Sequence, residues 1–334
     1  MISTTFAQKN RHHDKNQHHN RKYVPPFVVT LLFTLLLTGC AGTAQQAQTI
    51  SGHIKVSGST ALLPLVTAAS QAFEKQYPQA KIDVSGGGSL VGLQAVTTGK
   101  TNIGDSDIYA DPAAFPDPNL TDHIVCVTPF VMIVNRDVTI NSLTRQNIID
   151  IFSTGKYNNW DELQGSNIPI NPIVRPNSSG TRVTFRKYIL NGLDEKGTKL
   201  QVDDTQKVVN LVATTPGAIG YVALSAVTSA VKYVAIDGQE PTLENIGAGR
   251  YNFWSYEHMY TLGDNDPLIH AFLDYMTATA MQATAQQLHY IPIGAMELPT
   301  VGDASTTNPS NHATLASILL PARQESEDRR NESY

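Results

Sequence analysis

Three short segments combine hydroxyl side chains with glycine where a strand-like stretch gives way to a helical one. They are 58–61 (Gly-Ser-Thr-Ala), 86–89 (Gly-Gly-Gly-Ser) and 179–181 (Ser-Gly-Thr). The first turn of a helix has free backbone N–H groups and the positive end of the helix dipole. Small residues let an anion approach these groups closely. One such helix start is an ordinary Ser/Thr cap, but three of them favour an anion-binding site.

Two charged side chains stand beside these helix starts in the sequence. Arg175 precedes Ser179 by four residues, and Asp107 ends the strand-like segment 101–107. An arginine offers a planar fork that donates two hydrogen bonds to a tetrahedral oxyanion. An ionised carboxylate only accepts hydrogen bonds, so Asp107 suits an anion site only where it accepts one. Together with the three helix starts, these residues favour a cradle for an anion.

The elements that must position these residues alternate between strand-like and helix-like segments from His53 onward, which predicts an α/β architecture. The apolar run 123–135 is too long for one ordinary strand and suits a crossing between two lobes. In open α/β sheets, ligands bind beyond the carboxyl ends of the strands, where all three helix starts would lie. Strands are expected at 53–58, 81–88 (running into a glycine turn) and 101–107, and helices at 61–77, 89–99, 144–152, 180–190, 205–213, 267–277 and 280–289.

The first 39 residues have the composition of a signal peptide. Five Lys/Arg and one Asp within the first 23 residues precede an uncharged run of 11 residues, 27–37. That run is shorter than the ~20 residues needed to span a bilayer. It ends in Leu-Thr-Gly-Cys40, which resembles the lipobox of bacterial lipoproteins, in which the cysteine is diacylated. We therefore expect a lipid anchor at Cys40, followed by a polar tether over 40–52, on the extracytoplasmic side of the cell membrane.

The composition of the chain without residues 1–39 argues against a nucleic-acid-binding protein. Removal of 1–39 takes away five of the 24 Lys/Arg and one of the 29 Asp/Glu, which leaves a net charge of −9. An acidic chain does not favour a nucleic-acid partner.

Cys126 has no disulfide partner if Cys40 is lipidated, and we expect it to be a buried small apolar residue. The Ser/Thr/Asn-rich segment 299–334 is expected to be a disordered tail.

Motifs of catalytic and metal sites are incomplete in this chain. Gly99-Lys100-Thr101 resembles the end of a P-loop, but Gln94 stands where that motif needs glycine. Ser89 lacks the second glycine of a nucleophile elbow, because position 91 is valine. The sequence has no His-Glu-x-x-His motif and no cysteine cluster, and nothing in it indicates a Ser-His-Asp triad. We therefore expect no enzyme activity, no metal and no cofactor.

Seven ordered segments resemble the phosphate-binding lipoproteins of phosphate ABC importers, which have the two-lobed periplasmic-binding-protein fold. The resemblance covers about 53–296. The segments are GSTALLPL (58–65), SGGGSLVG (85–92), IGDSD (103–107), LTRQNIIDIFSTGKYNNW (143–160), RPNSSGTRVTF (175–185), TPGAIGYV (215–222) and WSYEHMYTLGDNDPLIHAFLDYM (254–276). The chain departs from many relatives at Ile108, where they have arginine, and in its 299–334 extension.

The resemblance implies a set of phosphate ligands that come from four of these segments. They are Thr60, the Ala61 backbone, Ser89, Asp107, Arg175, Ser179, Gly180 and Thr181, with Ser59 as an addition. It also implies two lobes, one formed by 53–128 and 255–298 and the other by 129–254. The segments 125–135 and 255–262 would be the crossings between them.

The sequence thus predicts a monomeric, lipid-anchored receptor that captures inorganic phosphate and hands it to an ABC import permease. A phosphatase or phosphotransferase using the same cradle is one alternative. A surface protein with a sensory or adhesive role is another, with 299–334 as its interaction element. Release of phosphate from an ester would identify the first alternative, and transport in a strain lacking the protein would test the second.

Overall fold

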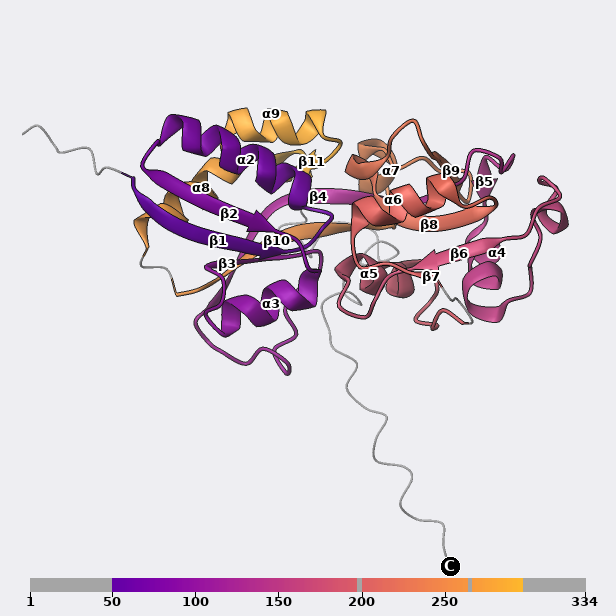
Figure 1. The fold of residues 1–334 in the computed structure, drawn as a ribbon, viewed down its shortest axis with the longest axis horizontal. Helices are drawn as coiled ribbons and strands as arrows, with labels where there is room; N and C mark the ends of the chain where they lie inside the picture. Colours follow the sequence, from indigo (N-terminus) through magenta and orange to yellow (C-terminus); the bar gives the residue numbers. More distant parts are fainter. Residues whose placement is uncertain (1–49, 197–199, 264–265, 297–334) are drawn as a thin grey trace, which may run out of the picture. The chain divides into compact units, whose positions relative to one another are not determined.

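The computed structural model describes residues 50–196, 200–263 and 266–296 (Figure 1). The predicted signal peptide, the lipidation site Cys40, most of the tether and the 299–334 tail lie outside these residues. Within the described ranges, no helix is long and apolar enough to span a bilayer.

The first part of the described chain forms the predicted strand–helix alternation. Strand β1 (Gly52–Gly58) lies between β2 (Ala80–Ser85) and β3 (Ile103–Ser106), and both pairings are parallel. Helices α2 (Leu63–Gln76) and α3 (Ser89–Thr97) follow β1 and β2. The predicted start of the first helix at 61 was two residues early, because 60–62 form a turn ahead of it. The predicted end of the second strand was late, since β2 stops where the glycine turn begins.

A single long strand, β4 (Leu120–Val134), connects these first strands to the strands that follow later in the chain. Strand β4 has 15 residues, which corresponds to about 50 Å of extended chain. It pairs along its first part with β10 (Trp254–Leu262), and along its last part with β8 (Ala218–Ala223) and β9 (Lys232–Ile236), always antiparallel. The apolar run 123–135 is therefore one strand that belongs to two regions of sheet (Figure 1).

The remaining strands extend these two regions. Strand β10 is antiparallel to β3, so a late part of the chain returns beside the first three strands. Strand β6 (Asn171–Val174) runs parallel to both β8 and β7 (Leu200–Gln201). Two short strands complete the pairing, β5 (Ser142–Leu143) with β9 and β11 (Ile291–Pro292) with β4.

Four of the five later predicted helices form close to their expected bounds, and one is interrupted. They are α5 (Gly180–Tyr188), α6 (Thr205–Thr214), α8 (Pro267–Thr277) and α9 (Thr279–Gln287). The helix expected at 144–152 is instead the short α4 (Arg145–Ile149), followed by a π-helical turn over Asp150–Thr154 that ends at Gly155. The structure adds α7 (Leu243–Gly247), which was not predicted.

Separate sets of apolar side chains form the core. One set lies between β1 and β2 and helices α2, α8 and α9, where Phe73 and Phe272 meet edge to face at 5.5 Å. A second set surrounds Phe130, Phe185 and Tyr221, and a third lies under α6. Cys126 is fully buried in the first set as a free thiol, which confirms the expectation that it is a small core residue.

Candidate anion-binding site

Two of the predicted helix starts are held together because they follow β1 and β2, which pair in parallel. Ser59, Thr60 and Ala61 follow β1 directly, and the carbonyl of Gly58 accepts a hydrogen bond from the N–H of Gly88 at 2.8 Å. Gly58 has φ +145°, and a Cβ there would lie 2.1 Å from the carbonyl oxygen of Asp105. A glycine at this position therefore lets β3 come close enough to place Asp107 beside the start of α2.

Asp107 is the point at which all three helix starts meet. Its carboxylate, on a residue only 2% exposed, accepts hydrogen bonds from the hydroxyl of Ser59 at one oxygen and from that of Thr181 at the other. The Thr181 bond is 2.7 Å long, and the backbone N–H of Asp107 donates to Ser89 Oγ at 2.9 Å. Asp107 is thus oriented by three hydroxyl groups.

Arg175 lies in the same cluster and is fully buried. Its guanidinium donates to Thr60 Oγ1 at 3.0 Å, to the Asp203 carbonyl at 3.1 Å and to Thr205 Oγ1 at 3.3 Å. Its Nε has no partner, and no described carboxylate accepts a hydrogen bond from it. Burial lowers the pKa of Arg175 from its usual value, an effect that the charge of Asp107 opposes. A buried cation bonded only to neutral oxygens has donors and charge available for an anion.

Ser179, Gly180 and Thr181 bring the start of α5 against the start of α3. Ser179 caps α5 by accepting from the N–H of Arg182 at 3.3 Å, and the N–H of Leu90 donates to the Ser178 carbonyl at 3.1 Å. The structure therefore brings all nine predicted site residues into one buried cluster, joined through Asp107 and Arg175.

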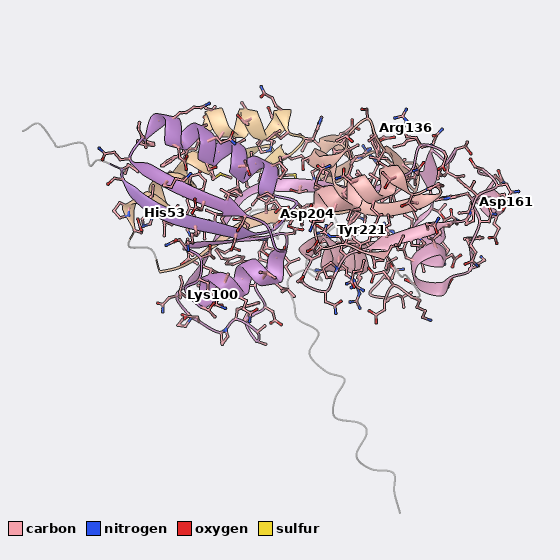
Figure 2. The ribbon with its side chains drawn as sticks, in the orientation of Figure 1. His53, Lys100, Arg136, Asp161, Asp204 and Tyr221 are labelled. Carbon is pink, nitrogen blue, oxygen red and sulfur yellow. The ribbon has the colours of Figure 1, made fainter. Side chains whose placement is uncertain are left out.

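Three further residues that sequence reasoning missed hold the backbone of Arg175. The side chain of Arg182 donates to the Arg175 carbonyl at 2.8 Å and forms an ion pair with Glu195 at 2.9 Å. The hydroxyl of Tyr221 (labelled in Figure 2) accepts from the Arg175 N–H at 3.2 Å and donates to Glu195 at 3.0 Å. Burial raises the pKa of Tyr221 well above its usual range, which keeps this donor protonated.

Thr205 was also missed. It begins α6, capped by Asp204 (labelled in Figure 2), and is 3% exposed. Its hydroxyl lies 2.8 Å from that of Thr60 and accepts from Arg175. A signal was available, because Asp203 and Asp204 directly precede the helical segment expected at 205–213, which begins with Thr205, and this is the pattern of a fourth capped helix start.

Comparison with known proteins identifies the family of this chain. The family model described as a PBP superfamily domain matches residues 43–280. The phosphate-binding protein PstS of Bacillus subtilis is 39% identical over 259 residues, which cover 77% of this chain and 86% of that protein. The chain belongs to the PstS family.

Solved structures of related binding proteins share the fold. A putative phosphate ABC transporter substrate-binding protein from Clostridium perfringens, with bound phosphate, aligns with a TM-score of 0.68 at 25% identity. The alignment covers 72% of this chain and 100% of that one. An ABC-type phosphate transport receptor from Vibrio cholerae aligns with a TM-score of 0.58 at 22% identity, over 71% and 99% of the two chains. The two-lobed α/β fold predicted from the sequence is thereby confirmed.

For this PstS-family protein we expect Gly180→Ala to impair binding at the cluster without unfolding the chain. A Cβ at Gly180 would lie 2.3 Å from Ser89 Oγ and 2.9 Å from Asp107 Cβ, so the starts of α3 and α5 would have to separate. Such overpacking costs about 1–3 kcal/mol. Phosphate titration by calorimetry, with circular dichroism as a check on folding, would measure the effect. Gly247→Ala is the control, because its Cβ would meet nothing within 4 Å; equal losses in both variants would contradict the contact argument.

Proposed function

We propose that this protein is an extracytoplasmic receptor that binds inorganic phosphate and delivers it to an ABC import permease. The observation that carries the proposal is the burial, in one cluster, of Arg175, which has charge and donors to offer, and of Asp107, which only accepts hydrogen bonds. The names of its relatives, phosphate-binding proteins and phosphate transport receptors, support the same ligand.

The chemistry of phosphate matches both residues. Inorganic phosphate has three acidic protons, and the second is lost near the value of about 6 found for phosphate esters, so near neutral pH it still carries at least one proton. Arg175 neutralises charge on the oxygens, while Asp107 accepts the remaining proton in a hydrogen bond. The helix starts at Thr60, Ser89 and Gly180 add N–H and hydroxyl donors.

We also propose that the ligand is enclosed by two lobes, 53–128 with 255–298 and 129–254. The separate apolar cores and the two pairing regions of β4 support this division. In this arrangement β4 and β10 are the crossings, and Arg175 and Thr60 come from different lobes. Their hydrogen bond is then a contact that closure makes.

Uptake of radiolabelled phosphate tests the receptor role. A strain in which this gene is deleted should lose high-affinity uptake, and the wild-type gene should restore it. The Arg175→Ala gene should fail to restore uptake although its product is present at normal level. Full uptake without the gene would reject the transport role, and release of phosphate from an ester by the purified protein would favour an enzyme instead.

We expect attachment to the membrane through Cys40. The basic start, the short apolar run and Leu-Thr-Gly-Cys support lipidation at this residue. Cys40→Ala should leave the protein without acyl chains, either unprocessed or released from the membrane fraction. Mass spectrometry of the mature N-terminus measures this, and an unacylated wild-type chain that begins elsewhere would reject the anchor.

A further inference from the structure

Glu257 lies next to Asp107 across two neighbouring strands. In the antiparallel pair β3–β10, Asp105 is opposite Met259 and Ser106 is opposite His258. Continued by one residue, this register places Glu257 opposite Asp107, at the separation of a cross-strand pair, where Cβ atoms are about 4.5–5.5 Å apart. Both side chains are buried, Glu257 completely and Asp107 to all but 2%.

Among the residues that the structure describes, those around Glu257 include other acidic groups and no basic partner. Asp105 lies on β3, Cys126 is the partner of Glu257 on β4, and Tyr290 lies close enough to interact with its charge. The Thr128 hydroxyl lies beside it on β4, yet no described donor is within hydrogen-bonding geometry of either Glu257 oxygen. The carboxyl oxygens of Asp105 also have no described partner. Arg175 is the cation of this region, and it interacts with Asp107.

Two adjacent buried carboxyls cannot both ionise without a large cost, so one of them holds a proton. Asp107 accepts hydrogen bonds from Ser59 and Thr181 and feels the charge of Arg175, all of which stabilise its ionised form. Glu257 has none of these. Burial raises the pKa of Glu257 well above its usual range, the charges of Asp107 and Asp105 raise it further, and the Thr128 hydroxyl opposes this rise only in part.

We infer that Glu257 is a positioning residue that stays protonated at neutral pH and donates its O–H to Asp107. A protonated carboxyl is a donor, whereas two ionised carboxylates only repel each other. Asp107 is then held ionised by three O–H groups, those of Ser59, Thr181 and Glu257, and keeps a free lone pair toward the ligand. The effect on phosphate rests on the proposed function, but the proton on Glu257 can be measured without phosphate.

The first experiment uses the ligand-free protein. A buried carboxyl that stays protonated binds one more proton in the folded than in the unfolded state, so stability falls as pH rises above about 4.3, the ordinary pKa of Glu, toward the raised folded value. Urea unfolding between pH 6 and 8 should therefore show a smaller pH dependence for Glu257→Gln than for wild type. The expected difference is one proton, a factor of about ten in the unfolding equilibrium constant per pH unit. The exposed Glu244→Gln variant should keep the wild-type slope. An unchanged slope in Glu257→Gln would overturn the inference.

The second experiment measures phosphate binding by calorimetry at pH 7. The amide of Glu257→Gln still donates to Asp107, so it should bind phosphate within about threefold of wild type. Glu257→Met has a similar size but no donor, and it should bind at least tenfold more weakly with a reduced preference for phosphate over sulfate. A Gln variant as weak as the Met variant, or a Met variant as tight as wild type, would overturn the positioning role. If wild type itself binds no phosphate, the proposed function fails, while the unfolding experiment still decides whether Glu257 holds the proton.

Discussion

Arg175→Ala should weaken phosphate binding by about 2–5 kcal/mol, a factor of roughly 30 to 4,000 in Kd. The guanidinium is fully buried and is bonded only to neutral oxygens of Thr60, Asp203 and Thr205. Its removal leaves the negative charge of the bound phosphate without a nearby cation. It also leaves those three oxygens without their hydrogen-bond donor. Calorimetry of the purified variant against phosphate measures the loss directly.

Two companion variants separate the charge from the shape of the Arg175 side chain. Arg175→Lys keeps the charge but lacks the planar fork, so it should restore binding only in part. Arg250→Ala is the matched control, because Arg250 is partly exposed and its ion pair with Glu244 lies at the surface. A lysine variant that binds phosphate as tightly as wild type would contradict a bidentate hydrogen bond from Arg175 to phosphate.

Asp107→Asn should reduce the discrimination between phosphate and sulfate. Sulfate carries no proton at neutral pH, so in the wild type it would place a bare oxygen against a carboxylate, with repulsion that a low dielectric strengthens. Sites that require a ligand hydrogen bond reject analogues that lack it by roughly 10⁴–10⁵-fold in the best cases. An asparagine amide donates to either anion, so the phosphate-to-sulfate affinity ratio should fall. Competition calorimetry at one pH gives this ratio.

The Asp107 prediction has a control in the same loop region. Asp111→Asn removes an exposed carboxylate and should leave the ratio unchanged. If Asp107 served only to cap the turn that follows it, the Asp107→Asn and wild-type proteins would have equal ratios. That result would remove Asp107 from the selectivity mechanism.

The helix starts that gather around Asp107 could be recognised in the sequence because each belongs to a short local pattern. Ser59, Ser89 and Gly180 each stand at a strand-to-helix or loop-to-helix junction, and such junctions place N–H groups at the same edge of an α/β sheet. A segment of a few residues was therefore enough to recognise each helix start, and in the structure the three helix starts meet at Asp107.

The supporting residues could not be predicted in this way, since they depend on pairings between distant parts of the chain. Glu257 reaches Asp107 only because β10 returns beside β3, about 150 residues later in the sequence. Glu195 supports Arg175 through Tyr221 and Arg182, which come from β8 and α5. No spacing within one segment indicates such contacts.

Element boundaries failed where local geometry overrode periodicity. The apolar pattern at 144–152 predicted one helix, but the chain forms a π-helical turn from Asp150 onward and then adopts a left-handed conformation at Gly155. The apolar run 123–135 suggested a crossing between lobes, which stays a prediction, and it could not show which strands pair with β4.

Direct titration of the purified wild-type protein with phosphate and with sulfate is the measurement that tests the central claim. The account predicts that one phosphate binds per chain, with sulfate weaker by several orders of magnitude and with the phosphate signal lost or strongly weakened in Arg175→Ala. Absence of phosphate binding, or equal affinity for the two anions, would contradict it.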